Sequence, residues 1–230
     1  MKETSKSVLR RLSDSRFATR FFVGMGIDIG CGTDPISMYG ELFPRMTGLK
    51  AWDVGDGDAQ FMKGVADATY DFVHSSHCLE HLNDPAEGLA NWLRILKPGG
   101  HMIVLVPDED LYEGGQFPST YNKDHKATFT IQKAKSWSPR SYNVLQLLGG
   151  LGPAAEVVKL ELLDATHRYR LPRFDQTLTP IGESAIEFVL RRRTQAEIDA
   201  GGRLPPPGGI TRNDFLFLTG IPLPEPKPGG

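Results

Sequence analysis

The chain has 230 residues, a hydrophobic fraction of 40% and a formal net charge of −2 at pH 7. This length and apolar content suit one domain with a sizeable core. The near-neutral charge argues against a general nucleic-acid surface or membrane surface, and we find no apolar run of the roughly 20 residues that cross a bilayer. The two cysteines, Cys31 and Cys78, are too few for a disulfide framework or a cysteine metal cluster, so we expect a cytoplasmic location.

Residues 1–22 are expected to form a helical segment that leads into the first strand. The segment contains four arginines but no apolar signal core, and Glu3 and Asp14 argue against a transit peptide. We therefore predict a surface helix here and not a targeting sequence.

The first strand is predicted at 23–29 and runs into a glycine-bearing turn, Gly30-Cys31-Gly32-Thr33. Asp34-Pro35 closes the turn, because Asp is a good N-cap and Pro suits the first position of a helix. A strand, a tight turn and a helix start place glycine backbone, uncovered by side chains, and free N–H groups at the carboxyl end of a parallel strand. Open α/β sheets bind ligands at that edge.

This turn differs from the dinucleotide fingerprint G-x-G-x-x-G, because position 35 is Pro where that pattern has Gly. Asp28 lies two residues before Gly30, and its negative charge would not help to bind a pyrophosphate, which is itself negative. Its carboxylate suits a ligand with a cationic amino group, although any strand-to-helix turn remains the plainer interpretation.

The second strand is predicted at 48–53 and ends in Asp53, 25 positions after Asp28. Doubly wound folds place an acid near this spacing to bind the ribose hydroxyls; an exposed strand-end Asp without a ligand is the alternative. Asp58-Ala59 follows in a segment where the usual crossover helix is missing or very short. The Asp58 carboxylate either accepts from an amino group or belongs to a solvated turn.

A further strand is predicted at 70–76, ending in Ser75 and Ser76, and His77-Cys78-Leu79-Glu80-His81 follows it. Asp84 and Pro85 then start a helix with apolar residues at helical spacing over 85–96. Lys97-Pro98-Gly99-Gly100 stops this helix, and 101–106 is apolar almost throughout, as in a central parallel strand.

Two groups of residues together resemble the class I S-adenosylmethionine-dependent methyltransferases, of the small single-domain kind. The first is the pattern Asp28-x-Gly30-x-Gly32. The second is the order Leu-Glu-His at 79–81, helix, Leu-Lys-Pro-Gly-Gly at 96–100 and apolar strand. The match covers about residues 23–107, and it departs from the usual pattern where Asp34 replaces a small residue.

The resemblance implies an α/β fold: a doubly wound, mostly parallel, Rossmann-like sheet of seven strands with an antiparallel C-terminal hairpin. The half-exposed strands predicted at 157–164 and 184–191 suit that hairpin. It also implies an enzyme with S-adenosyl-L-methionine as cofactor, and Asp58 facing the adenine amine. The cofactor-binding residues that we predict are Asp28, Gly30, Cys31, Gly32, Asp53, Asp58, Ala59, Ser75 and Ser76.

We predict a methyltransferase domain over 23–193 and a Pro/Gly-rich tail over 194–230. Residues 108–138 are long for a connection and rich in polar and aromatic side chains, which is typical of a functional cover. The arginine-containing segment 165–175, together with this cover, suits a polar, sugar-like or anionic acceptor. The expected partner is thus a small molecule or glycan, and the oligomeric state is left open.

Transfer to a hydroxyl needs a base. The candidates are His77, directly after the strand predicted at 70–76, and His125, in the cover. His125 is either oriented by Asp124 or is a solvated loop histidine. We expect His81 to be structural. We predict no metal site, because the histidines lack zinc spacing and the sequential acids 108–110 point different ways.

The predicted reaction is methyl transfer from S-adenosylmethionine to a small molecule or glycan, at oxygen. A nicotinamide-dependent oxidoreductase is the first alternative, but neither the dinucleotide glycines nor a Tyr-x-x-x-Lys pattern is found. A non-catalytic S-adenosylmethionine-binding scaffold is the second.

Overall fold

The computed structural model describes residues 3–170, 172, 175, 178–203, 213, 216 and 220–222. The chain divides into two compact units, Met1–Thr194 and Gln195–Gly230. In the second unit the helix α4 (Gln195–Asp199) is described, with Gln195 Nε2 donating to Asp199 Oδ1 at 2.7 Å. Most of the predicted tail beyond residue 203 lies outside the described residues, as does Arg173 of the arginine-containing segment.

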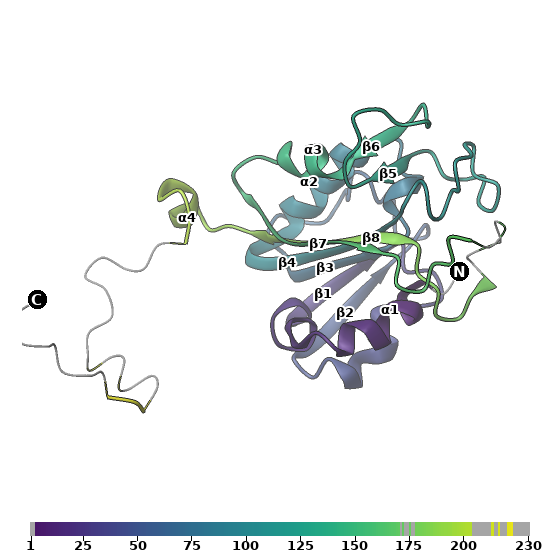
Figure 1. Cartoon of the computed structure of the whole chain (residues 1–230). Helices are drawn as coiled ribbons and strands as arrows, with labels where there is room; N and C mark the ends of the chain where they lie inside the picture. Colours follow the sequence, from purple (N-terminus) through teal and green to yellow (C-terminus); the bar gives the residue numbers. More distant parts are fainter. Residues whose placement is uncertain are drawn as a thin grey trace, which may run out of the picture. The chain divides into compact units, whose positions relative to one another are not determined.

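A six-stranded mixed sheet forms the centre of the first unit, in the order β2-β1-β3-β4-β8-β7 (Figure 1). Neighbours from β2 to β4 run parallel, whereas β8 is antiparallel to both β4 and β7. The strands are β1 (Gly24–Ile29), β2 (Met46–Trp52), β3 (Tyr70–Ser76), β4 (Leu96–Pro107), β7 (Ala155–Leu163) and β8 (Ala185–Arg192).

This topology confirms the predicted doubly wound, mostly parallel sheet with its antiparallel hairpin. The resemblance implied seven strands, one more than this sheet has, and residues 53–69 between β2 and β3 form turns, as the expected lack of a crossover helix indicated. Two short strands outside this sheet, β5 (Thr128–Thr130) and β6 (Ser141–Asn143), pair in parallel with each other.

Helical segments cover both faces of the sheet (Figure 1). They are α1 (Glu3–Leu12), the π-helix η1 (Phe17–Phe21), the 3₁₀ helices η2 (Ile36–Leu42) and η3 (Leu79–His81), α2 (Pro85–Ile95) and α3 (Val144–Gly149). In the described part of the chain, no helix is long and apolar enough to cross a membrane.

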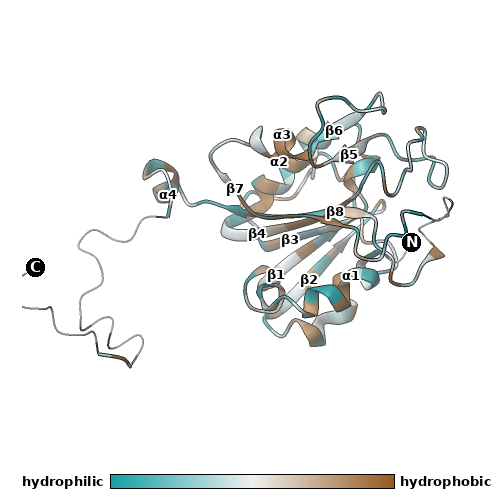
Figure 2. Ribbon diagram, viewed as in Figure 1, coloured by the Kyte–Doolittle hydropathy of each residue, from teal (hydrophilic) through white to brown (hydrophobic). Residues whose placement is uncertain are grey.

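Alternate strand residues supply two separate cores, as the pleat of a sheet requires. Val73 and Met102 belong to a large cluster with α2, whereas Phe72 and Ile103 join the phenylalanines of η1 on the other face. Figure 2 shows hydrophobic colour on α2 and β8 and hydrophilic colour along much of the outer loops. Because both faces of the sheet are filled by apolar side chains, we expect a ligand site at the edge of the sheet where the loops join the strands.

The predicted helix starts have different outcomes. Asp84 caps α2 as expected, its Oδ1 accepting from the N–H groups of Ala86 and Glu87. The short helix expected after the turn is present as η2, but the prediction that Asp34 caps it was wrong: Pro35 is its N-cap residue, and no side chain caps it. Ser138-Pro139 has the cap-and-proline pattern that predicts a helix start, but α3 begins only at Val144, because 141–143 pair with β5.

Candidate functional site

The glycine turn after β1 has the backbone that its residues require. Gly30 and Gly32 have φ angles of 72° and 53°, which favour glycine. A Cβ on Gly30 would lie 2.5 Å from the Cys78 side chain, whereas a Cβ on Gly32 would meet no heavy atom within 4 Å. Gly30 thus permits close packing inside the fold, and Gly32 leaves its outer side open.

Three parallel strands end beside this turn. The register pairs Ile29 with both Trp52 and Ser75, so the residues that follow come to one edge of the sheet. A pocket of about 250 Å³ lies there. It is lined by Glu3, Thr4, Gly30, Cys31, Gly32, Thr33, Asp34, Ser76 and His77.

Five of the predicted site residues are therefore brought together at the pocket: Gly30, Cys31, Gly32, Ser76 and His77. The amino end of α1, which the sequence did not place at the site, forms another wall. Asp34 holds it there, since its Oδ2 accepts from Ser5 N at 2.8 Å and its Oδ1 from Tyr39 Oη at 2.6 Å. Asp34 caps α1 and not the helix that follows it in sequence, and no local pattern signals such a contact between residues 29 apart.

Asp28 is fully buried, and both of its oxygens bind protein groups. Oδ2 accepts from Ile36 N and Oδ1 contacts His74 Nδ1, each at 2.7 Å. Arg11 Nη1 lies 3.1 Å from His74 Nε2. Because Arg11 can only donate, His74 Nε2 accepts and its Nδ1–H donates to Asp28. Asp28 and His74 thus tie β1 to β3 and α1, and the contact of Asp28 with a ligand stays a prediction.

The other predicted cofactor residues lie along or beside the same edge, outside the described lining of the pocket. Ser75 Oγ donates to Ile29 O at 3.0 Å within the sheet. Asp53 is partly exposed directly after β2, and Asp58 is exposed, its Oδ1 accepting from Gln60 N at 2.7 Å. Ala59 O accepts from Trp92 Nε1 at 2.8 Å. The contact of these four residues with a ligand stays a prediction.

His77 closes the pocket from β3. Its φ of 53° is unusual for a residue with a Cβ, and such strain is concentrated at functional sites. Its Nε2 lies 3.7 Å from Glu3 Oε2 and its Nδ1 3.4 Å from Glu80 Oε1. Burial lowers the pKa of His77, but the carboxylates of Glu3 and Glu80 more than offset this, so the pKa is raised above its ordinary value.

His125 is buried behind His77, and both predicted environments for it are wrong. It is only 3% exposed, so it is not a solvated loop histidine. Glu113, and not Asp124, orients it, through a 2.5 Å contact between Oε1 and His125 Nδ1. The Tyr112 ring stacks on the His125 ring with centroids 5.6 Å apart. His125 is thus outside the described lining of the pocket, one layer deeper.

The predicted cover over 108–138 is anchored to the sheet edge. Glu80 O accepts from the N–H groups of Lys126 and Ala127, at 2.8 and 3.2 Å. Glu109 is buried and accepts from four side chains: Thr128, Lys133, Ser136 and Ser141. Protein groups bind each of the acids 108–110, and Glu109 and Asp110 share the Lys133 ammonium.

The two thiols remain neutral at physiological pH. Burial, with the nearby Asp28 and Asp53 carboxylates, raises the pKa of Cys31 to about 11. Burial raises the pKa of Cys78 to about 12. Neither cysteine is bonded to the other, and neither is suited to act as a thiolate nucleophile.

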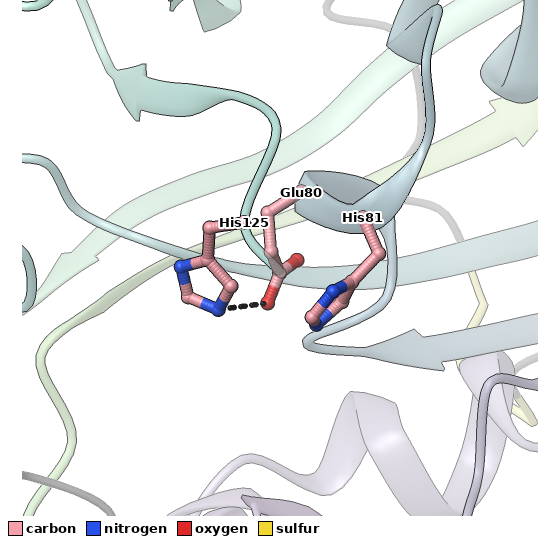
Figure 3. A group of neighbouring side chains, drawn as sticks. All are labelled: Glu80, His81 and His125. Carbon is pink, nitrogen blue, oxygen red and sulfur yellow. Dashed lines mark ion pairs between the residues drawn. The ribbon is translucent and has the colours of Figure 1, made fainter. Parts of the chain in front are cut away.

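Glu80, His81 and His125 form a second polar group beside the pocket (Figure 3). Each offers one ligand atom, and these atoms lie within 4.8 Å of one another. This grouping, which no sequence spacing indicated, has the donor types of a metal site.

Residues 2–148 match the family described as a methyltransferase domain, which is more than half of the chain. The chain belongs to this methyltransferase family. A curated relative, described as an uncharacterized 37.1 kDa protein in transposon TN4556 of Streptomyces fradiae, is 29% identical over 121 residues. That alignment covers 46% of this chain and 35% of the relative, so the chain matches about a third of the relative's length.

Solved structures share the fold of the methyltransferase. A methyltransferase from Archaeoglobus fulgidus, described as S-adenosylmethionine-dependent, has a TM-score of 0.53 at 18% identity, covering 84% of this chain and 95% of its own. A structure from Bacillus halodurans, described as a methyltransferase by similarity, has a TM-score of 0.51 at 14% identity, covering 81% and 99%. These two similarities show that the fold is shared.

The resemblance to class I methyltransferases is thereby confirmed. Residues 2–148 form a methyltransferase domain by family, for which S-adenosyl-L-methionine is the cofactor, and the pocket lies at the glycine turn that carried the first half of the resemblance. The nicotinamide alternative is set aside.

Proposed function

We propose that this methyltransferase moves the methyl group of S-adenosylmethionine to a hydroxyl oxygen of a polar small molecule or sugar-like acceptor. The observation that carries the proposal is the pocket at the glycine turn, closed by a buried imidazole, His77, between two carboxylates. Transfer at oxygen and the class of acceptor rest on this chemistry and on the polar cover.

The cofactor is proposed to follow the carboxyl edge of the parallel strands. Gly30 and Gly32 allow its methionine end to approach the backbone, Asp53 is placed to accept from the ribose hydroxyls, and Asp58 from the adenine amine. Asp53 is partly exposed and Asp58 is exposed.

Methyl transfer from a sulfonium is an in-line displacement, and the leaving group is already activated. The protein contributes chiefly alignment of acceptor oxygen, methyl carbon and sulfur, an effect that reaches about 7–11 kcal/mol. As the O–CH3 bond forms and the S–CH3 bond breaks, the acceptor hydroxyl loses its proton. His77 takes that proton, and S-adenosylhomocysteine leaves.

The test has two stages. Calorimetric titrations with S-adenosylmethionine, S-adenosylhomocysteine and NADH come first, and we expect the first two to bind and NADH not to bind. Transfer of labelled methyl to a panel of polar hydroxyl compounds, sugars first, follows. Binding without transfer to any acceptor would favour the non-catalytic scaffold. Reaction in the cytoplasm remains a prediction from cysteine usage.

His77 is tested by His77→Gln against His101→Gln. His101 pairs with Phe72, at the opposite end of β3 from the pocket, so it loses the same group far from the proposed chemistry. We expect His77→Gln to lower turnover by about 10²-fold or more while cofactor affinity changes little, and His101→Gln to leave turnover unchanged. Equal turnover in both variants would remove His77 from the reaction.

A further inference from the structure

The group formed by Glu80, His81 and His125 contains unsatisfied polar atoms in a buried place. Glu80 is 0% exposed, and neither of its side-chain oxygens has a hydrogen-bond partner among the described residues. His125 Nε2 is also buried and without a hydrogen bond. Buried polar atoms normally find partners, because leaving one unpaired costs about 1–3 kcal/mol and more when it is charged. Glu80 Oε1 and His125 Nε2 lie 3.8 Å apart, too far for a direct hydrogen bond, so a bound ion between them would satisfy both.

The hydrogen bonds of the two histidines decide which nitrogens are available. His81 Nδ1 lies 3.2 Å from Asp124 O, a carbonyl that can only accept, so Nδ1 carries the proton and Nε2 keeps its lone pair. His125 Nδ1 contacts Glu113 Oε1 at 2.5 Å in the same way. The Nε2 lone pair of His125 therefore faces Glu80 Oε1, as the dashed line in Figure 3 marks, and the His81 ring lies beside Glu80 with a lone pair left at its Nε2.

These contacts are the outer-shell arrangement that metal-binding histidines show. A ligating histidine usually donates its other N–H to a carboxylate or a backbone carbonyl, which fixes the tautomer and the ring. Here Glu113 does this for His125 and Asp124 O does it for His81. Tyr112, stacked on His125, further restricts that ring.

The spacing suits one ion. His125 Nε2 lies 3.8 Å from Glu80 Oε1, and two ligands with bonds of about 2.1 Å can lie up to about 4.2 Å apart. The three ligand atoms lie within 4.8 Å of one another, so the widest pair would close by up to about 0.6 Å on one ion. His81, on the short helix η3, is only partly buried and is within reach of solvent.

We propose that Glu80, His81 and His125 bind one divalent transition-metal ion, with Zn²⁺ or Mn²⁺ as the expected kind. Two imidazoles and one carboxylate suit such ions better than Ca²⁺ or Mg²⁺, which prefer all-oxygen sites. Three protein ligands leave coordination positions open. His77 Nδ1 lies 3.4 Å from the same Glu80 oxygen, so the ion would lie one residue from the pocket. Its use in holding an acceptor oxygen rests on the proposed function.

The binding test needs neither cofactor nor acceptor. The full chain, stripped with a chelator, is dialysed against ZnCl₂ and separately titrated with MnCl₂ under electron paramagnetic resonance. We expect one ion per chain and a rise in thermal midpoint that grows with ion concentration. His81→Gln, at a partly exposed position, should weaken binding by more than 100-fold, and Glu113→Gln, which removes only the outer-shell charge, by about 10–100-fold. His101→Gln is the matched control and should bind as the unaltered protein does.

Failure to bind either ion at millimolar concentration overturns the site, as does one-to-one binding that His81→Gln and Glu80→Gln leave unchanged. Circular dichroism of each variant shows that loss of binding is not loss of fold; because Glu80 is fully buried, the partly exposed His81 carries the decision if Glu80→Gln unfolds. Cofactor titration of the same samples separates this outcome from the proposed function. A chain that binds S-adenosylmethionine but no metal loses only the metal site, and one that binds metal but no cofactor loses only the proposed reaction.

Discussion

At the scale of single residues, Gly30 and Gly32 occupy one turn but meet different surroundings. Gly30→Ala adds a Cβ at positive φ against the Cys78 side chain, so we expect it to lower the free energy of unfolding by about 3 kcal/mol. Gly32→Ala carries only the conformational cost, about 1 kcal/mol, but its methyl group fills the open side of the turn. Urea unfolding and cofactor titration of both variants measure this: Gly32→Ala should lose cofactor affinity while staying folded. Equal stabilities would mean that the Cys78 contact is unimportant.

Asp53 is a second single-residue case. Its carboxylate ends β2 next to the glycine turn and is partly exposed, with Oδ1 accepting from the following N–H of Val54 at 2.8 Å. We expect Asp53→Ala to weaken S-adenosylmethionine binding by about tenfold, the worth of one good hydrogen bond to a charged group, with an unchanged thermal midpoint. Calorimetry checks this, and unaltered affinity would take Asp53 out of the cofactor site.

Asp108 has a pH-dependent effect on stability. Burial raises its pKa to about 6, although the N–H groups of Leu111 and Asp110 oppose this. Because the folded state holds the proton more tightly than the unfolded state, stability falls as pH rises from about 4 to 6 and stays lower above that, by about 3 kcal/mol. Asp108→Asn keeps an acceptor for both N–H groups and removes the charge. It should therefore match the unaltered protein near pH 4 and exceed its stability at pH 8 in denaturant titrations; a smaller stability at pH 8 would contradict this.

At the scale of elements, α1 is fastened to β8 by a buried carboxylate among three cations. Glu187 is 0% exposed and contacts Arg10 at 2.8 Å, Arg11 at 3.0 Å and Lys159 at 2.7 Å. Burial would raise the pKa of Glu187, but Arg11, Arg10 and Lys159 outweigh it and hold the pKa well below its ordinary value. The stabilisation by Glu187 is thus full above its ordinary pKa of 4.5 and is lost as pH falls.

We expect Glu187→Gln to lower the free energy of unfolding at pH 7 by about 3–5 kcal/mol, because it leaves the buried Arg11 without its carboxylate. Asp14→Asn, which breaks the more exposed Arg16 contact at 2.7 Å, should cost less than about 1 kcal/mol. Urea unfolding at pH 7 compares the two. Similar small losses would show that Arg11 finds another partner.

The elements that the sequence predicted well are those with a local periodic signal. Residues 70–76 and the helix from Pro85 were located closely, since apolar spacing and the Asp84 cap are read within one segment. The errors lie where distant residues decide. Ser5 takes the Asp34 carboxylate from across 29 positions, and residues 128–130 draw 141–143 into a strand and delay α3.

The site residues also divide into those that a local pattern predicts and those that distant contacts place. The residues of the glycine turn and of the end of β3 were predicted because parallel strand ends converge by rule. Glu3 and Thr4 were not predicted, because α1 reaches the turn through a contact between residues 29 apart. The Glu113–His125 contact was not predicted, because no periodicity encodes a loop.

At the scale of the whole molecule, the chain separates after Thr194, and the first unit contains all strands of both described sheets. We expect a chain ending at residue 194 to keep its thermal midpoint and its affinity for S-adenosylmethionine, since the sheet and the pocket are complete without the second unit. Calorimetric scanning and titration of the shortened chain test this. A lower midpoint would show that the core depends on the tail.

The wall that α1 adds to the pocket has a practical consequence for handling the protein. Glu3 and Thr4 line the pocket directly, and the Ser5 N–H is held by Asp34 of the glycine turn. A bulky group attached to Glu3 or Thr4 would crowd the pocket and weaken the Asp34 contact. Inactivity of a preparation altered at this end of α1 would then report the alteration and not the enzyme.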